Sequence, residues 1–174
     1  MENQPIPIWK HSLMYGIYTG AALIVLSLVF YVLDLYTENW ASWFSYAALL
    51  AGVVMASIHY RDKYNNGLIT YGQSVSAGFL TALFAGVVAS IYTYIFMTFV
   101  GEEFAQTMLA IVEEKTIASN PEISDEELDM ILDWTGRMFQ PTWLTIMGLL
   151  SNAGMGLVFA LIASIFIKKE EQAI

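Results

Sequence analysis

The sequence contains no cysteine and has few charged residues for its length. Of its 174 residues, 13% are charged, about half the usual share in a soluble domain. The absence of cysteine excludes disulfides, thiolate ligands for metals and thiol redox chemistry. The shortage of charge is typical of a chain that spends much of its length in an apolar environment, and 57% of the residues are apolar.

Sequence motifs of known chemistry are also missing. The chain has no Gly-x-Ser-x-Gly, His-Glu-x-x-His, Walker-type or Gly-x-Gly-x-x-Gly motif. Its seven basic residues form no patch of the kind that binds nucleic acid. We therefore expect a non-enzymatic protein with no catalytic residues, no metal, no cofactor and no nucleic-acid partner.

Four stretches of the chain are apolar and almost free of charge. Each is near or above the ~20 residues that a helix needs to cross a bilayer. A single Lys or Arg at the centre of such a helix would cost about 2.5–3.5 kcal/mol on insertion, so the lack of central charges is informative. The pattern predicts four transmembrane helices, at about 11–35, 41–60, 73–100 and 142–167.

The segment 101–141, between the last two predicted spans, is strongly acidic. It holds ten carboxylates and two basic residues, but apolar residues also recur in it at helical spacing. We expect amphipathic helices at about 102–118 and 124–139, with Ser124 and Glu127 forming a capping box at the start of the second. The acidic faces could hold a divalent cation or attract a basic partner, or they could simply be solvated.

The predicted fold class is therefore all-α integral membrane. We expect one membrane domain over residues 1–174, built as a bundle of four transmembrane helices with an acidic helical hairpin inserted before the last one.

Basic residues near the ends of the spans predict the orientation. Five fall on one side if the four helices alternate: Lys10, Arg61, Lys63, Lys168 and Lys169. The other side has only Lys115 and Arg137, both within the acidic segment. By the positive-inside rule, both termini are expected in the cytoplasm. The acidic segment is then expected outside, which for a bacterial inner-membrane protein is the periplasm.

Polar residues in the last span are the first candidate for a functional site. Ser151 and Asn152 lie near its middle, followed closely by Gly154 and Gly156. A buried Asn needs a hydrogen-bond partner, and glycines favour an unwound stretch of the kind found in some transporters. The alternative is a packing position whose amide is already hydrogen-bonded.

Two histidines lie at the expected cytoplasmic boundary. His11 begins the first span and His59 ends the second, and with Asp62 they could form a metal or catalytic site. The alternative is that they are ordinary interfacial polar residues. Asp34 is the acid nearest to a span. It would be a functional candidate at depth, but costs little at the outer boundary.

The start of the third span contains two further polar candidates. Gln73 follows Gly72 after a turn signal at Asn66-Gly67, and Ser74 is a possible N-cap.

Small residues recur four apart in several spans. Examples are Gly16 and Gly20 in the first span, Ala48 and Gly52 in the second, and the series Ser74, Gly78, Ala82 and Gly86 in the third. Such faces let helices approach closely without water. They favour either homodimerisation or packing inside one bundle.

The stretch 64–74, Tyr-Asn-Asn-Gly-Leu-Ile-Thr-Tyr-Gly-Gln-Ser, followed by Gly78 and by Ile-Tyr-Thr-Tyr-Ile at 91–95, resembles a known family. It is similar to domain-of-unknown-function family 4199, whose members are four-helix membrane proteins. The last helix, which ends at Lys168-Lys169, fits as well. The resemblance implies an uncharacterised bacterial inner-membrane protein, and it supplies no activity and no site residues.

The leading functional hypothesis is a membrane scaffold or accessory subunit. Its acidic hairpin would dock on the bundle or on a partner, and its partners would be the lipid bilayer and another membrane protein or a second copy of the chain. The alternative is a small oligomeric transporter or channel that uses the polar break in the last span. A membrane enzyme built on His11, His59 and Asp62 is a third hypothesis.

Overall fold

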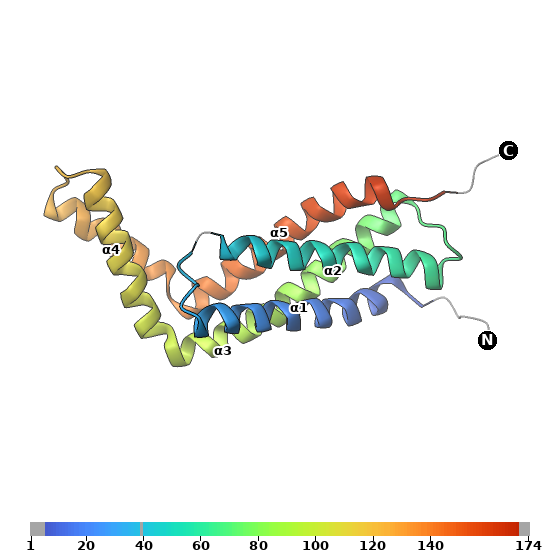
Figure 1. Ribbon diagram of the computed structural model, residues 1–174, viewed down its shortest axis with the longest axis horizontal. Helices are drawn as coiled ribbons and strands as arrows, with labels where there is room; N and C mark the ends of the chain where they lie inside the picture. The colour runs from blue at the N-terminus through green and yellow to red at the C-terminus, as the bar shows by residue number, and fades with distance from the viewer. Residues whose placement is uncertain (1–5, 39, 171–174) are drawn as a thin grey trace. The chain divides into compact units, whose positions relative to one another are not determined.

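The structure is a computed structural model that describes residues 6–38 and 40–170. In this part of the chain all regular structure is helical, apart from one isolated antiparallel bridge between Ile69 and Lys169 (Figure 1). The helices are α1 (Ile8–Val32), α2 (Ala41–Tyr64), α3 (Tyr71–Ser119), α4 (Asp125–Met138) and α5 (Pro141–Ile167). The predicted all-α class is confirmed.

Four of these helices are long and apolar enough to cross a membrane: α1, α2, α3 and α5. They correspond to the four apolar stretches of the sequence, and four such helices suggest a multi-pass membrane protein. The helices form two compact units. Unit 1 contains α1, α2, α3 as far as Ala89, and α5 from Gly148 onwards, whereas unit 2 is Ser90–Met147.

The helix α3 is longer than the sequence pattern predicts. Separate helices were expected at about 73–100 and 102–118, but the structure has one continuous helix of 49 residues. The two expected helices are separated only by Gly101, and this residue is helical in the structure. A glycine inside a helix costs only about 1 kcal/mol relative to alanine, and no proline follows it before residue 121. Gly101 alone is therefore too weak a signal to end a helix.

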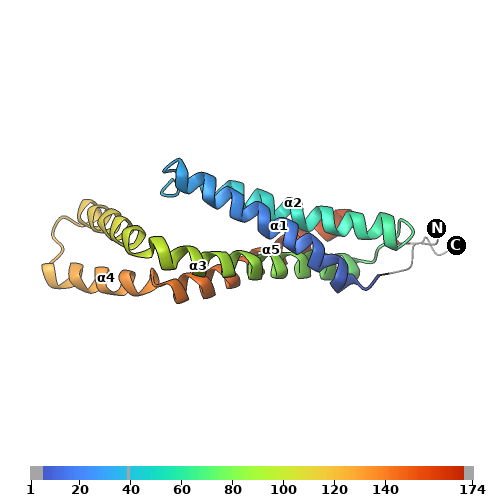
Figure 2. The same cartoon turned by 90° about the horizontal axis from the view of Figure 1, so that it is seen from below.

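Unit 1 is held together by small residues. Helices α1 and α2 lie side by side in both views (Figures 1 and 2). On α1, Gly16 lies against Phe84 of α3, so that a methyl group at Gly16 would overlap its Cβ. On α5, Gly156 lies in the same way against Ala82 of α3. The buried apolar core that results is made mostly of alanine, valine and leucine: Leu23, Leu49, Val53, Ala82, Ala85 and Ala160.

These contacts show where the small-residue faces are used. Gly52 of α2 faces Thr19 of α1, and Gly86 of α3 faces Asn152 of α5. Close contacts between glycine and a neighbouring helix give dispersion energy where lipid offers no hydrophobic driving force. The small-residue faces therefore pack against one another within a single chain, which is one of the two alternatives given by the sequence.

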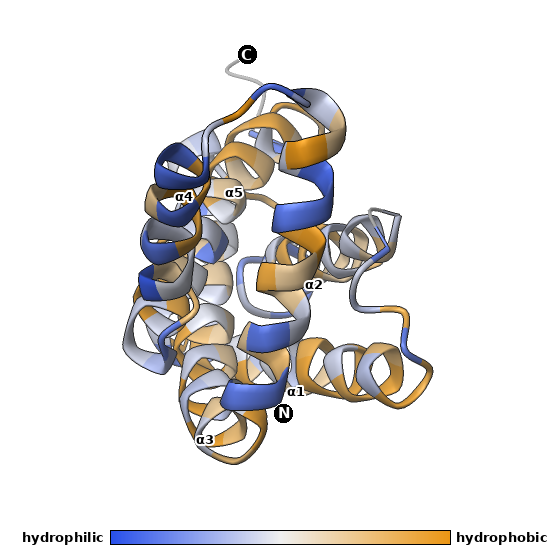
Figure 3. Ribbon diagram, turned by 90° about the vertical axis from the view of Figure 1, so that its left-hand side faces the viewer, coloured by the Kyte–Doolittle hydropathy of each residue, from blue (hydrophilic) through white to orange (hydrophobic). Residues whose placement is uncertain are grey.

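Unit 2 contains a short helical pair. The rings of Phe104 on α3 and Phe139 near the end of α4 lie 5.9 Å apart, edge to face. Leu109 lies beside Gly136 of α4. These contacts place the acidic helix α4 along the C-terminal part of α3. Viewed by hydropathy, α4 alternates between hydrophilic and hydrophobic colour, as an amphipathic helix does (Figure 3).

The start of α4 follows the sequence prediction. The Ser124 hydroxyl accepts a hydrogen bond from the backbone N–H of Glu127, at 3.3 Å. The Glu127 carboxylate in turn accepts one from the backbone N–H of Ser124, also at 3.3 Å. This capping box satisfies two backbone donors, and the carboxylates of the first turn interact favourably with the helix dipole. The predicted capping box is therefore confirmed.

Candidate functional site

At one end of unit 1, α1 begins and α2 and α5 finish (Figures 1 and 2). We call it the basic end. Ile69, in the loop before α3, pairs with Lys169 just after α5, through backbone hydrogen bonds of 2.8 and 2.9 Å. The Tyr60 hydroxyl on α2 donates to the carbonyl of Ile6, just before α1, at 3.4 Å. The five basic residues that the sequence places on one side lie on these adjoining segments.

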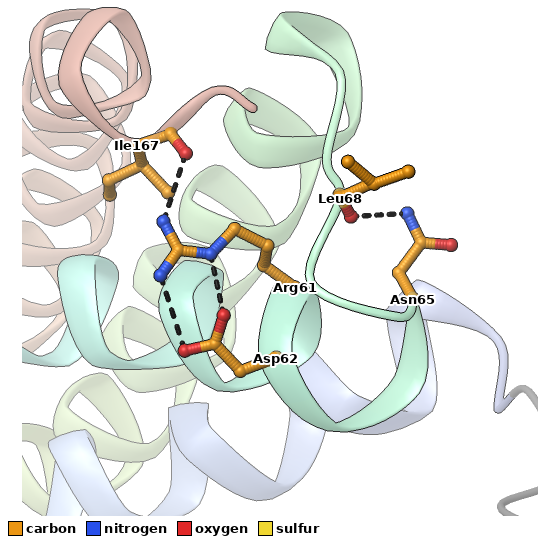
Figure 4. Close-up of polar contacts among 5 residues, drawn as sticks. All are labelled: Arg61, Asp62, Asn65, Leu68 and Ile167. Carbon is orange, nitrogen blue, oxygen red and sulfur yellow. Dashed lines mark hydrogen bonds and ion pairs between the residues drawn. The ribbon is translucent and has the colours of Figure 1, made fainter. Parts of the chain in front are cut away.

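Arg61 organises the basic end (Figure 4). Its Nε donates to Oδ1 of Asp62 at 2.7 Å and its Nη2 to Oδ2 at 3.2 Å. Its Nη1 donates to the backbone carbonyl of Ile167, at 3.2 Å, in the last residue of α5. The last carbonyls of a helix have no partner within the helix, so Arg61 acts as a C-terminal cap for α5 and ties it to α2.

The two histidines do come together. Their rings stack with centroids 5.2 Å apart and planes 10° apart. His11 is completely buried, and its Nε2 lies 2.9 Å from the backbone carbonyl oxygen of Ala56. A carbonyl oxygen only accepts, so Nε2 is the donor in this hydrogen bond. Three tyrosines complete this ring cluster: Tyr15, Tyr60 and Tyr64.

The third member of the predicted histidine site is elsewhere. Asp62 is exposed and its carboxylate is bonded to Arg61. Among the residues that the structure describes, no three His, Asp or Glu side chains are grouped so that they could hold a metal ion. The structure thus brings His11 and His59 together but leaves Asp62 out, and the histidine pair fastens α1 to α2.

Gln73 and Ser74 have roles that differ from those expected. The Thr70 hydroxyl accepts from the Gln73 backbone N–H at 3.2 Å, and Oε1 of Gln73 accepts from the Thr70 N–H at 3.1 Å. Thr70, and not Ser74, is therefore the N-cap of α3, with Gln73 closing a capping box. The helix begins earlier than expected because this Thr-x-x-Gln pattern precedes the Gly-Gln-Ser sequence.

Ser74 instead belongs to a layer of buried hydroxyls. The hydroxyl of Ser164 on α5 donates to the Ser74 hydroxyl at 2.8 Å. The Ser57 hydroxyl on α2 donates to the Ser74 carbonyl at 3.2 Å, and the Ser12 hydroxyl on α1 donates to the Ala77 carbonyl at 3.0 Å. This hydroxyl layer joins α3 to the other three helices of unit 1. Single serines within apolar spans were the available signal, but they carry no spacing that identifies their partners.

The segment around Ser151 and Asn152, the candidate site in the last span, is part of a continuous helix. Nδ2 of Asn152 donates to the carbonyl of Gly148, one turn earlier in α5, at 2.9 Å. Of the two alternatives, the unwound stretch near Gly154 is not observed, since α5 is helical throughout Pro141–Ile167. Ser151 is exposed. The amide of Asn152 is thus satisfied by its own helix, and its Cβ packs against Gly86.

Asp34 ends α1. Its backbone φ is +61°, in the left-handed region. Its N–H bonds to the carbonyl of Tyr31 at 3.1 Å, and the N–H of Leu35 bonds to that of Phe30 at 2.8 Å. This is a Schellman motif with Asp34 in the position usually taken by glycine. The carboxylate is exposed, so Asp34 has a structural role at the helix end.

The model of a family described as "Protein of unknown function (DUF4199)" matches residues 14–169. The chain belongs to this family. The match extends from the second turn of α1 to just past the end of α5, and it includes His59 of the ring cluster and Ser74 of the hydroxyl layer. No curated protein and no solved structure matches the chain.

Proposed function

We propose that this DUF4199 protein is a non-enzymatic accessory subunit or scaffold of a bacterial inner membrane. Its partner-binding surface is the acidic face of α4, and its partner is a membrane protein with a basic exposed surface. Helices α1, α2, α3 and α5 anchor the protein in the bilayer.

The distribution of charge supports an orientation for this function. The basic end of unit 1 carries five Lys and Arg residues, whereas the segment 101–141 carries ten carboxylates. Basic residues are retained on the cytoplasmic side of bacterial membranes. We therefore assign the basic end and both termini to the cytoplasm, and the acidic helices to the periplasm.

The observation that carries the proposal is the exposed acidic face of α4. Glu126, Asp129 and Asp133 follow one another at helical spacing and are all exposed. In the described residues no ion pair joins a carboxylate of the segment 101–141 to Lys115 or Arg137. Unneutralised charge of one sign on a folded helix steers and orients a partner of the opposite sign.

The apolar inner face of α4 supports the view that this helix is an ordered part of the fold. Leu128, Leu132 and Phe139 are partly buried, on the side that carries the contact with α3. The capping box at Ser124 fixes the start of the helix. A solvated linker needs neither feature, whereas a recognition surface needs both, since a rigid helix loses less entropy on binding.

The test removes the three charges of the acidic face. The variant Glu126→Gln, Asp129→Asn, Asp133→Asn is expressed in the native host, and the protein is extracted gently and captured by a tag. We expect the partner to be lost from this variant and retained by the wild-type protein, with binding that weakens as salt rises. The matched control, Glu102→Gln, Glu103→Gln, Glu113→Gln, removes three carboxylates from α3. Equal recovery of the partner by both variants would contradict the proposal.

The transporter hypothesis gains no comparable observation. It rested on a polar break near Asn152, and α5 continues through this position with the amide bonded to its own helix. We therefore put forward the accessory subunit alone.

A further inference from the structure

Unit 2 contains an apolar groove at the corner between α4 and α5. Its volume is about 500 Å³. It is lined by Trp134, Arg137, Met138, Phe139, Trp143, Leu144 and Met147. Both tryptophans remain substantially exposed, Trp134 by 63% and Trp143 by 46%. The groove is thus a concave surface of aromatic rings and flexible thioethers with one positive charge.

The groove lies where the sequence changes character. Residues 101–140 are rich in carboxylates, whereas α5 carries no charged residue and is one of the helices that could cross a membrane. The first turns of α5 supply Trp143, Leu144 and Met147 to the lining. The groove therefore adjoins the exposed apolar surface at the start of α5, the helix that spans the bilayer in the function proposed above.

The lining selects for one kind of occupant. Tryptophan rings are enriched at headgroup depth, where one edge is apolar and the other is wet. Methionine side chains adapt to flexible apolar chains. Arg137 is the one charged residue in the lining, and none of the ten carboxylates of the acidic segment contributes to it. A guanidinium binds a phosphate through paired hydrogen bonds.

We propose that this groove binds one phospholipid molecule of the bilayer. Its phosphate bonds to Arg137 at the polar end, and an acyl chain lies on Trp134, Met138 and Trp143. On α4, the lining residues Trp134 and Met138 lie on a different face from the acidic residues, whereas Arg137 lies one turn after Asp133 and borders the acidic face.

The test uses native mass spectrometry of the full-length protein in detergent. Phosphatidylglycerol is titrated against diacylglycerol with the same acyl chains, which lacks the phosphate. We expect one phosphatidylglycerol to be retained by the wild-type protein. The variant Arg137→Gln is expected to weaken its binding about tenfold, because a charge-assisted hydrogen-bond pair is lost. The control Lys115→Gln removes the other basic residue of the same segment and should bind as the wild type does.

Two results would overturn the proposal. One is equal retention of phosphatidylglycerol by Arg137→Gln and Lys115→Gln. The other is binding of diacylglycerol as tight as that of phosphatidylglycerol. A second variant, Leu144→Trp, fills the groove and leaves Arg137 in place. If it keeps its helical circular dichroism and still retains the lipid fully, the groove is not the site. If this variant does not fold, the comparison of lipid retention by Arg137→Gln and Lys115→Gln tests the proposal without it.

Discussion

The hydroxyl of Ser164 on α5 donates a hydrogen bond of 2.8 Å to the hydroxyl of Ser74 on α3, a residue that lies 90 positions earlier in the sequence. Both side chains are fully buried. Ser74 also offers its backbone carbonyl to Ser57 of α2. One serine near the start of α3 therefore links three helices at a level where water is excluded.

This relationship predicts the effect of removing the serine. Ser74→Ala leaves the Ser164 hydroxyl buried without its partner, and should lower the free energy of unfolding by about 1 kcal/mol. Ser76→Ala, two residues along the same helix at an exposed position, should have no measurable effect. Unfolding in mixed micelles, followed by circular dichroism as denaturing detergent is added, measures both. If the double variant Ser74→Ala, Ser164→Ala lost as much as the sum of the single variants, the two hydroxyls would not be coupled.

The contact between α3 and α5 predicts a difference between two neighbouring glycines. A methyl group at Gly156 would overlap the Cβ of Ala82, whereas one at Gly154 would meet no atom within 4 Å. Gly156→Ala should lower the free energy of unfolding by about 1–3 kcal/mol, because the helices must separate. Gly154→Ala should leave it unchanged or raise it by up to about 1 kcal/mol. Equal effects in the same unfolding assay would show that α3 and α5 do not pack in this way.

The ring cluster predicts unequal roles for the two histidines. His11→Ala removes a fully buried ring and its bond to Ala56, so it should lower the free energy of unfolding by about 2–5 kcal/mol. His59→Phe keeps a stacked ring on His11 and should cost less than about 1.5 kcal/mol. If His59→Phe abolished partner binding or a cellular phenotype while the protein stayed folded, the histidine pair would have a chemical role beyond packing.

The absence of cysteine makes the proposed orientation directly testable. A single thiol can be introduced at Asp129 on α4 or at Lys169 after α5, both exposed positions. With a membrane-impermeant maleimide, Asp129→Cys should be labelled in cells whose outer membrane is permeabilised and whose inner membrane is intact. Lys169→Cys should be labelled only after the inner membrane is opened. The reverse pattern would place the acidic helices in the cytoplasm.

The apolar helices could be predicted from the sequence because their signal is strong and local. A stretch of about 20 residues without charge leaves few alternatives in a chain of this composition. The capping box at Ser124 was equally readable, since its two residues lie three apart and interact only with each other. Both features depend on neighbours along the chain.

The features that were missed depend on distant neighbours or on competing local signals. Ser74 was interpreted as an N-cap because its partner Ser164 cannot be identified from spacing. Thr70 was not recognised as the N-cap of α3, although the Thr-x-x-Gln pattern of a capping box can be read from the sequence. The boundary near residue 101 was placed where the charged residues begin, but a change from apolar to charged residues does not end a helix, and the structure has one helix over Tyr71–Ser119. For the candidate histidine site, the sequence predicted that His11 and His59 lie at the same membrane boundary. Only the structure shows that the Asp62 carboxylate is paired with Arg61.

The most direct test of the proposed function is native mass spectrometry of the protein extracted gently from its own membrane. The accessory-subunit account predicts a stable complex with a different membrane protein. This complex should dissociate when Glu126, Asp129 and Asp133 are neutralised and persist in the α3 control variant. A monomer or a homo-oligomer alone, under conditions that preserve other membrane complexes of the same cells, would contradict the account.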